Sequence, residues 1–222
     1  MNIYKVCLEL QDPLYFATRE LGRLYVTERY LHNYALTYAL GFARSTYHDL
    51  EHIPHYREHL EPLNSQSVYV TPARPITSDY VTHTYKWAKL RYHVDNSEQT
   101  SKNIPTFGRI RELAPESRFE CFIISEQELT LPKWIRLGKW MSKAEVKVDP
   151  LEIKSRHNGV FTCTYPLNPL DVMFTNQVLS YDTVNMPPVS LIRNVQIQGE
   201  YYTFEGSNSL KLPLKMEYRF NS

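Results

Sequence analysis

The sequence predicts an α+β fold in which a strand-helix-strand unit is followed by a mostly β part. Near the N-terminus, Tyr4, Val6, Leu8 and Leu10 alternate with polar residues and a cysteine, which is the period of a strand with one buried face. Residues 210–220 alternate in the same way, so a second half-buried strand is expected at the C-terminus. Between these ends, apolar residues recur at helical spacing and predict an amphipathic helix.

A loop is expected to connect the first strand to this helix. Asp12-Pro13 ends the strand, and Thr27 is a candidate N-cap after the loop. The apolar stripe of the helix consists of Leu31, Tyr34, Ala35, Tyr38, Ala39 and Phe42. Gly41 is placed to end the helix, because glycine readily adopts the left-handed conformation of a C-terminal cap.

The middle of the chain predicts a projecting hairpin. Residues 64–70 have extended character, and residues 80–92 alternate as one arm of the hairpin, with Thr82 and Thr84 on one face. The polar residues 95–105 have no periodicity and are expected to form the tip of the hairpin or a loop. Residues 119–124 then return to a buried strand.

The last third of the chain predicts short strands, at residues 146–148, 160–165 and 195–204 before the C-terminal one. Pro213 places that last strand at an edge or a bulge. We therefore divide the chain into residues 1–128, a ferredoxin-type unit with the hairpin inserted at about 79–111, and residues 129–222, a mostly β part packed on it.

Composition excludes several classes of protein. The 222 residues are 42% hydrophobic, which is typical of a folded globular protein, and no apolar run approaches the roughly 18 residues of a membrane span. The N-terminus does not resemble a signal peptide, so a cytoplasmic location is expected. Cys7, Cys121 and Cys163 have no zinc-site spacing and are predicted to be reduced. The net charge of +1 means that any nucleic-acid surface is local.

Enzymatic motifs are weak. His48 and His52 flank Glu51 in an H-x-x-E-H pattern that on a helix would grip zinc, but Pro54 disfavours a helix there. The chain has no G-x-S-x-G elbow and too few glycines for a phosphate-binding loop, so no cofactor or metal is expected. A metal-independent endoribonuclease, with His83 or His93 as the base, stays an alternative.

The most informative segment is residues 131–147, which interleave tryptophan with lysine and arginine. Positive charge and flat stacking surfaces suit a polyanion with exposed bases. The candidate ligands of RNA or DNA in this segment are Arg136, Lys139, Trp140 and Lys143. Trp134 is expected in the core, whereas Trp140 either stacks on a base or is core. Lys139 and Lys143 would share a face if the segment were helical, and Gly138 would let a phosphate approach the backbone.

Two pairs of arginines complete the candidate nucleic-acid contacts. Arg19 and Arg23 lie in the predicted loop after the first strand, where Glu20 is an alternative partner for one of them. Arg109 and Arg111 have the spacing of residues on one side of an extended segment, with neutralisation by Glu112 or Glu116 as the alternative.

Three longer strings resemble one family. They are FATRELGRLYVTERYLHNYALTYALG, IPTFGRIRELAPESRFE and LPKWIRLGKWMSKAEV, within residues 1–165. They are similar to the Cas-five-type subunit of type I-D CRISPR effector complexes, the Csc-one family. The resemblance implies an RRM-like, ferredoxin-type domain with a projecting hairpin thumb and a β-rich C-terminal part.

The resemblance also implies a function. A protein of this kind is expected to hold the 5′ handle of the guide RNA without cleaving it, beside the backbone subunit and a polymerase-like large subunit, and to contribute to reading the protospacer-adjacent motif in target double-stranded DNA. The thumb would supply Tyr85, Lys86, Trp87, Lys89 and Arg91. No RNP-like string is present, so recognition should run through loops and the thumb.

Overall fold

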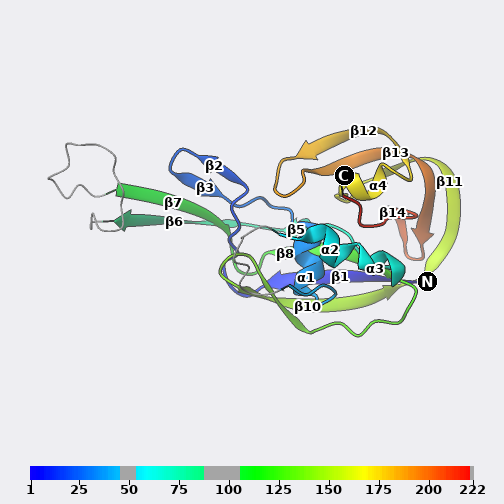
Figure 1. The fold of residues 1–222 in the computed structure, drawn as a ribbon, viewed down its shortest axis with the longest axis horizontal. Helices are drawn as coiled ribbons and strands as arrows, with labels where there is room; N and C mark the ends of the chain where they lie inside the picture. The colour runs from blue at the N-terminus through cyan, green and yellow to red at the C-terminus, as the bar shows by residue number, and fades with distance from the viewer. Residues whose placement is uncertain (46–53, 88–105, 221–222) are drawn as a thin grey trace.

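The first strand of the chain lies inside the first of three sheets. The structure is a computed structural model that describes residues 1–45, 54–87 and 106–220 (Figure 1). In this sheet the order is β4-β8-β1-β10-β9, and β5 also pairs with β8. The strands are β1 (Asn2–Leu10), β4 (Val68–Val70), β5 (Arg74–Thr77), β8 (Arg118–Ser125), β9 (Trp134–Leu137) and β10 (Ser142–Leu151). The strands predicted at residues 4–10 and 119–124 are confirmed.

Three helices lie against this sheet. They are α1 (Asn33–Ala39), α2 (Tyr56–Leu60) and α3 (Pro62–Ser65). The N-cap of α1 is His32 and not Thr27, because the His32 ring accepts a hydrogen bond from the Tyr34 amide. Gly41 follows the helix at φ +87°, as predicted. Part of the predicted extended stretch from residue 64 is helical instead, since α3 ends only at Ser65.

Residues 131–147 form a hairpin and not a helix. β9 and β10 pair antiparallel, with Lys143 opposite Arg136 and Ala144 opposite Ile135. Ile135 is buried while Arg136 is exposed, so the apolar side chains face the core and the charged ones face outward. Lys139 and Lys143 therefore do not share a helix face, as they would have done in a helical segment.

A second sheet contains the C-terminal half of the chain, with β13 at its centre. Its order is β11-β13-β12, and β14 pairs with the end of β13. The elements are β11 (Ile153–Cys163), α4 (Pro169–Val172), β12 (Gln177–Val184), β13 (Leu191–Phe204) and β14 (Ser207–Pro213). β14 ends at Pro213, earlier than predicted, although Met216 and Tyr218 remain buried in the expected alternation.

The two sheets share a core. Ile3 and Phe122 of the first sheet belong to the same buried cluster as Phe161, Ile197 and Tyr218. A second cluster lies between the first sheet and α1, around Leu36 and Leu40. β9 and β10 complete the first sheet, so its last strand ends at Leu151. The division of the chain into two parts at residue 128 stays a prediction.

The third sheet is a narrow arm that projects from the body (Figure 1). Its order is β2-β3-β7-β6, with β3 parallel to β7. The strands are β2 (Arg19–Leu21), β3 (Leu24–Val26), β6 (Tyr80–Trp87) and β7 (Thr106–Leu113). β6 and β7 are the predicted hairpin, whose tip at residues 95–105 lies outside the described residues. The predicted loop after β1 is wrong, since it contains the hairpin β2–β3.

Two general expectations are also tested. In the described parts of the chain, none of the helices combines the length and the apolar character required to cross a membrane. All three cysteines are free, and burial raises the pKa of the Cys163 thiol to about 12.

Candidate nucleic-acid interface

The arm sheet separates its charges between two faces. Strand register aligns Arg19, Val26, Arg111 and Thr82 in one row across the four strands. The next row, on the same face, consists of Leu21, Leu24, Arg109 and Thr84. Paired residues of a sheet project their side chains to the same side, so these arginines share one face, which we call the cationic face. The prediction that Arg109 and Arg111 point to one side is confirmed.

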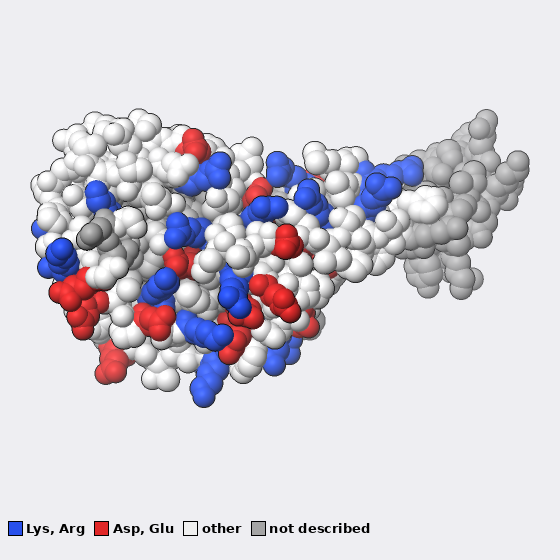
Figure 2. Space-filling view, turned by 180° about the vertical axis from the view of Figure 1, so that it is seen from behind, with Lys and Arg blue, Asp and Glu red and all other residues white. Residues whose placement is uncertain are grey.

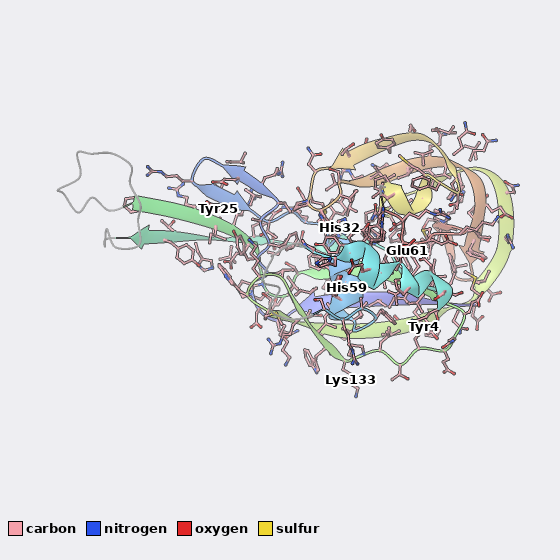
Figure 3. The ribbon with its side chains drawn as sticks, viewed as in Figure 1. Tyr4, Tyr25, His32, His59, Glu61 and Lys133 are labelled. Carbon is pink, nitrogen blue, oxygen red and sulfur yellow. The ribbon has the colours of Figure 1, made fainter. Side chains whose placement is uncertain are left out.

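The acidic residues of the arm lie on the opposite face. Register aligns Glu20, Tyr25, Ile110 and His83 there, and Glu112 follows two residues after Ile110. Glu20 accepts a hydrogen bond from Tyr25, which raises the pKa of the tyrosine. Among the described residues, Arg19 pairs with Glu28, and no ion pair joins Glu20 to Arg19 or Arg23. Figure 3 marks Tyr25 on β3, at the base of the arm.

Aromatic contacts fix two cations at the base of the cationic face. The Arg111 guanidinium lies 3.9 Å from the centroid of the Tyr80 ring, and Arg29 lies 4.9 Å from it. Such contacts hold the guanidinium planes while leaving their N–H groups available for phosphate oxygens. Neither Glu112 nor Glu116 forms an ion pair with Arg109 or Arg111 within the described residues.

The β2–β3 hairpin presents one paired and one unpaired arginine. Arg19 donates to Glu28 at 3.0 Å, so its charge is partly compensated. Arg23 is exposed next to Gly22, whose φ of +61° forms the tight turn between the strands. In the described part of the chain, Arg23 has no acidic partner. Figure 2 shows lysine and arginine gathered along the arm, with acidic residues more frequent on the body.

The remaining predicted thumb residues are only partly described. Tyr85 is 38% exposed and shares the opposite face with His83. Lys86 and Trp87 belong to β6, of which the structure gives the backbone there and not these two side chains. Lys89, Arg91 and His93 lie outside the described residues.

The β9–β10 hairpin carries the second set of predicted contacts. Lys143 lies over the Trp134 ring, with 3.8 Å between the ammonium nitrogen and the ring centroid. Trp134 is 45% exposed, so its predicted core position is wrong. Arg136 donates to the Met141 carbonyl at 3.0 Å and lies 3.9 Å from Asp12, at an exposed site where such a pair is weak.

The turn of this hairpin packs on the start of the chain. Gly138 adopts φ +72°, and a Cβ there would lie 2.5 Å from the Tyr15 carbonyl oxygen. The glycine therefore allows an approach by the protein's own backbone and not by a phosphate, as the 2.9 Å hydrogen bond from the Lys139 amide to Tyr15 also indicates. Trp140 is half exposed and packs against Tyr15 with the ring centroids 4.7 Å apart and the planes tilted by 33°.

A groove runs between α1 and this hairpin, and we call it the α1 groove. Its floor is formed by Ala35, Tyr38, Leu137 and Gly138, which line two adjoining hollows of about 280 and 690 Å³. The charged residues of its described lining are Arg136, Lys139 and Lys143, and no aspartate or glutamate is among them. Figure 3 marks Lys133, another cation of the same segment, at the margin of the first sheet.

A sequence model of one family matches residues 1–221. The family is described as type I-D CRISPR-associated protein Cas5/Csc1. The chain belongs to this family. A comparison with curated proteins finds no match.

Among solved structures, the chain is similar to a chain of "Cryo-EM structure of the Type III-B Cmr-beta bound to cognate target RNA and AMPPnP, state 1". The identity is 10%, the TM-score is 0.43, and the likeness covers 87% of this chain and 86% of the other. The assignment to the Cas5/Csc1 family rests on the sequence model alone, and it confirms the resemblance stated from the sequence.

The histidines that the sequence analysis considered for catalysis or metal binding in this Cas5/Csc1 protein lie in different surroundings. The H-x-x-E-H string at 48–52 lies outside the described residues, and within residues 1–45, 54–87 and 106–220 no group of three or more His, Cys, Asp or Glu side chains is arranged to hold a metal ion. His59 accepts or donates a hydrogen bond with the Tyr38 hydroxyl at 2.8 Å. His83 lies 3.5 Å from Glu112, a buried carboxyl whose pKa burial raises above its usual range.

Several residues of these surfaces were not predicted from the sequence. Tyr80 and Arg29 are separated by about fifty residues of chain, and Leu21 is a single exposed leucine within a polar hairpin, so no local pattern marks them. The lining of the α1 groove joins α1 to a hairpin about a hundred residues later. The basic-aromatic pattern of residues 131–147 predicted the wall of this groove that the β9–β10 hairpin forms, but not the wall that α1 forms.

Proposed function

We propose that this chain is a non-catalytic subunit of a type I-D CRISPR RNA-guided complex that binds the 5′ handle of the guide RNA. Its partners would be the guide RNA, the backbone subunit and the polymerase-like large subunit, at one end of the assembly. Membership of the Cas5/Csc1 family supports this proposal. No cofactor is required for it, since binding needs only charge and stacking surfaces.

The observation that carries the proposal is the segregation of charge on the arm. Arg19, Arg109 and Arg111 share one face of a four-stranded sheet, while Glu20 and Glu112 are on the other. A phosphate backbone that follows the cationic face meets guanidinium groups without passing a carboxylate of the sheet. The α1 groove offers a second surface of the same sign on the body.

The order β4-β8-β1-β10 further supports an RRM-like origin of the first sheet. α1 connects β1 to β4, and β8 lies between these two strands, as in a split β-α-β unit. Between β8 and β10 the chain forms β9 where a ferredoxin-type unit has its second helix. We infer that the unit has exchanged that helix for an additional strand.

Co-purification tests the proposal as a whole. The tagged chain, expressed with the neighbouring gene products of its locus, should bring down a multi-subunit complex that contains small RNA with a common repeat-derived 5′ end. Recovery of the chain alone, free of RNA, would contradict it. Extracted RNA is sequenced to locate the 5′ end.

A charge-matched comparison tests the cationic face. Replacing Arg109 and Arg111 by alanine should weaken RNA retention and reduce the slope of log affinity against log salt, by about 0.7 for each phosphate of single-stranded RNA that is no longer neutralised. The control replaces Lys154 and Lys211 of the second sheet, which removes the same charge. An equal weakening in both variants would assign the effect to net charge and contradict a local site.

Variants of the β2–β3 hairpin distinguish binding of RNA from binding of target DNA. Arg23, in its turn, and Arg19, at the start of β2, are the predicted contacts, with the exposed Leu21 between them in the sequence. If this hairpin contributes to reading the protospacer-adjacent motif, Arg19→Ala with Arg23→Ala should reduce target-duplex binding by an assembled complex whose RNA content is unchanged. Normal duplex binding by this variant would remove the motif-reading role.

The alternative function is a metal-independent endoribonuclease. The contact between His83 and the buried Glu112 is the observation that favours it, since a carboxyl can orient a histidine that acts as a base. The test is His83→Ala in a purified system without other nucleases. Our proposal expects unchanged guide maturation, whereas loss of cleavage would establish the enzyme.

A further inference from the structure

One end of the α1 groove is an apolar hollow with aromatic walls. Phe16, Tyr38 and Tyr56 line it together with buried leucines, and its volume is about 280 Å³. Lys139 is the charged residue of its described lining. The adjoining hollow, which shares Tyr38 and Ala35 with it, contains Arg136 and Lys143. Rings and cations are therefore neighbours along one continuous surface.

We propose that this hollow holds one unstacked base of single-stranded RNA, whose phosphates lie along Arg136, Lys139 and Lys143. The inference rests on the proposed function, and it names the part of the RNA and the residues that would receive it. An unpaired base has an apolar face that stacks on aromatic rings, while its sugar and phosphate stay at the charged rim.

Charge decides between RNA and a protein partner as the occupant. An apolar side chain of a partner would also fit the hollow, but the charged residues in the described lining of the path that leads into it are Arg136, Lys139 and Lys143, with Asp12 as a neighbouring carboxylate 3.9 Å from Arg136. A neutral peptide would gain little from three cations, whereas each phosphate of a strand gains a counter-charge. The observations thus favour the nucleic acid.

Two polar side chains of the hollow are already engaged, whereas the buried Tyr34 hydroxyl has no hydrogen-bond partner among the described residues. His32 uses both ring nitrogens, one with the Val189 carbonyl at 3.1 Å and the other with the Tyr34 amide at 3.2 Å. The Tyr38 hydroxyl is bonded to His59. Stacking remains as the main interaction, so the hollow should accept any base with modest preference.

Crosslinking locates the base. The full-length chain is mixed with single-stranded RNA oligonucleotides that carry 4-thiouridine at one position each, irradiated and digested. We expect crosslinks to peptides containing Phe16, Tyr38 or Tyr56 from one position of the strand only. Crosslinks spread evenly over the protein, or confined to the arm, would overturn the proposal.

A matched pair of variants tests stacking. Tyr38→Ala should weaken RNA binding roughly tenfold, as expected when one aromatic platform is removed, with an unchanged salt slope. Tyr38→Phe keeps the ring and removes the bond to His59, so its affinity should equal that of the wild type. Equal weakening in both variants would overturn stacking and indicate a role of the hydroxyl in the fold.

Ala35→Trp provides a variant that leaves the core intact, because Ala35 is exposed on α1 and lines both hollows. The added ring should block the hollow and remove the position-specific crosslink. If RNA retention and crosslinks persist, this inference fails and the proposed function stands. If the wild type binds no RNA, the proposed function fails first. Loss of a protein subunit, with RNA binding unchanged, would assign the hollow to a protein contact and overturn the inference.

Discussion

At the scale of residues, a buried carboxyl joins distant parts of the chain. Asp171 accepts hydrogen bonds from the Asn33 amide at 2.8 Å, the Tyr69 hydroxyl at 2.9 Å and the Arg219 backbone amide at 3.1 Å. These donors belong to α1, β4 and the C-terminal segment. Burial raises the pKa of Asp171 to about 7, although the three hydrogen bonds act in the opposite direction.

Burial shifts the pKa of His32 in the direction opposite to that of Asp171. Burial lowers the pKa of its ring to about 4, against the effect of the Val189 carbonyl. The neutral ring caps α1 and holds the segment that contains Val189, so protonation would disturb both contacts. Asp171 thus favours folding in acid, and His32 favours folding near neutrality.

These shifts predict a compensated pH profile. The pKa of Asp171 is raised on folding, so its contribution is complete below about pH 4 and is lost as pH rises to about 7. The pKa of His32 is lowered, so its contribution is complete above about pH 6.5 and is lost as pH falls to about 4. Between these values the two slopes oppose each other.

Asp171→Asn should expose the His32 slope, as a free energy of unfolding that falls by up to about 1.4 kcal/mol per pH unit on acidification from about 6.5 to about 4.5. Urea denaturation at several pH values measures it, with His32→Gln as the counterpart of opposite slope. Parallel profiles for the wild type and both variants would contradict this assignment.

At the scale of elements, long-range pairing explains what the sequence pattern could and could not predict. β1 and β13 were predicted because each alternates over several residues, and a single buried face is enough to produce that signal. β8 was predicted from its short apolar run, and both of its faces are buried. β2 and β3 have only three residues each and depend on β7, which lies about eighty residues later. No local pattern contains that information.

The candidate site follows the same rule. The common direction of Arg109 and Arg111 is a property of one strand, so spacing predicted it. The separation of Glu20 from the arginines depends on register across three strands. The α1 groove requires α1 to pack beside β9, and no local pattern shows this, because Trp134 and Lys143 meet across strands.

Replacing glycine by alanine should lower the free energy of unfolding by different amounts at the turns that contain Gly22 and Gly138. Gly22 and Gly138 both have left-handed φ, and no atom lies within 4 Å of a Cβ added at Gly22, whereas Gly138 would contact Leu14 and the Tyr15 carbonyl. Gly22→Ala should cost about 1 kcal/mol of unfolding free energy from backbone strain. Gly138→Ala should cost at least about 2 kcal/mol more, because backbone has to move. Urea midpoints compare them, and equal costs would contradict the crowding at Gly138.

At the scale of the whole molecule, the shared core predicts that the two expected parts do not fold separately. Residues 1–128 lack β9 and β10, which leaves one side of β1 unpaired, and they lose the second-sheet half of the larger core cluster. This fragment should show no cooperative urea transition, and adding residues 129–222 in trans should restore one. A cooperative transition of 1–128 alone would establish it as an independent domain.

The central place of β1 has a consequence for the protein's biosynthesis. β1 leaves the ribosome well before its neighbours β8 and β10, which begin at Arg118 and Ser142. At translation rates of about 5–20 residues per second, the nascent strand waits roughly ten seconds with its apolar face uncovered. Lys5 and Glu9 on its other face reduce the tendency of such a strand to associate with copies of itself. A chaperone that binds exposed apolar strands should therefore raise the soluble yield when it is present during synthesis, whereas slower translation without it should lower that yield.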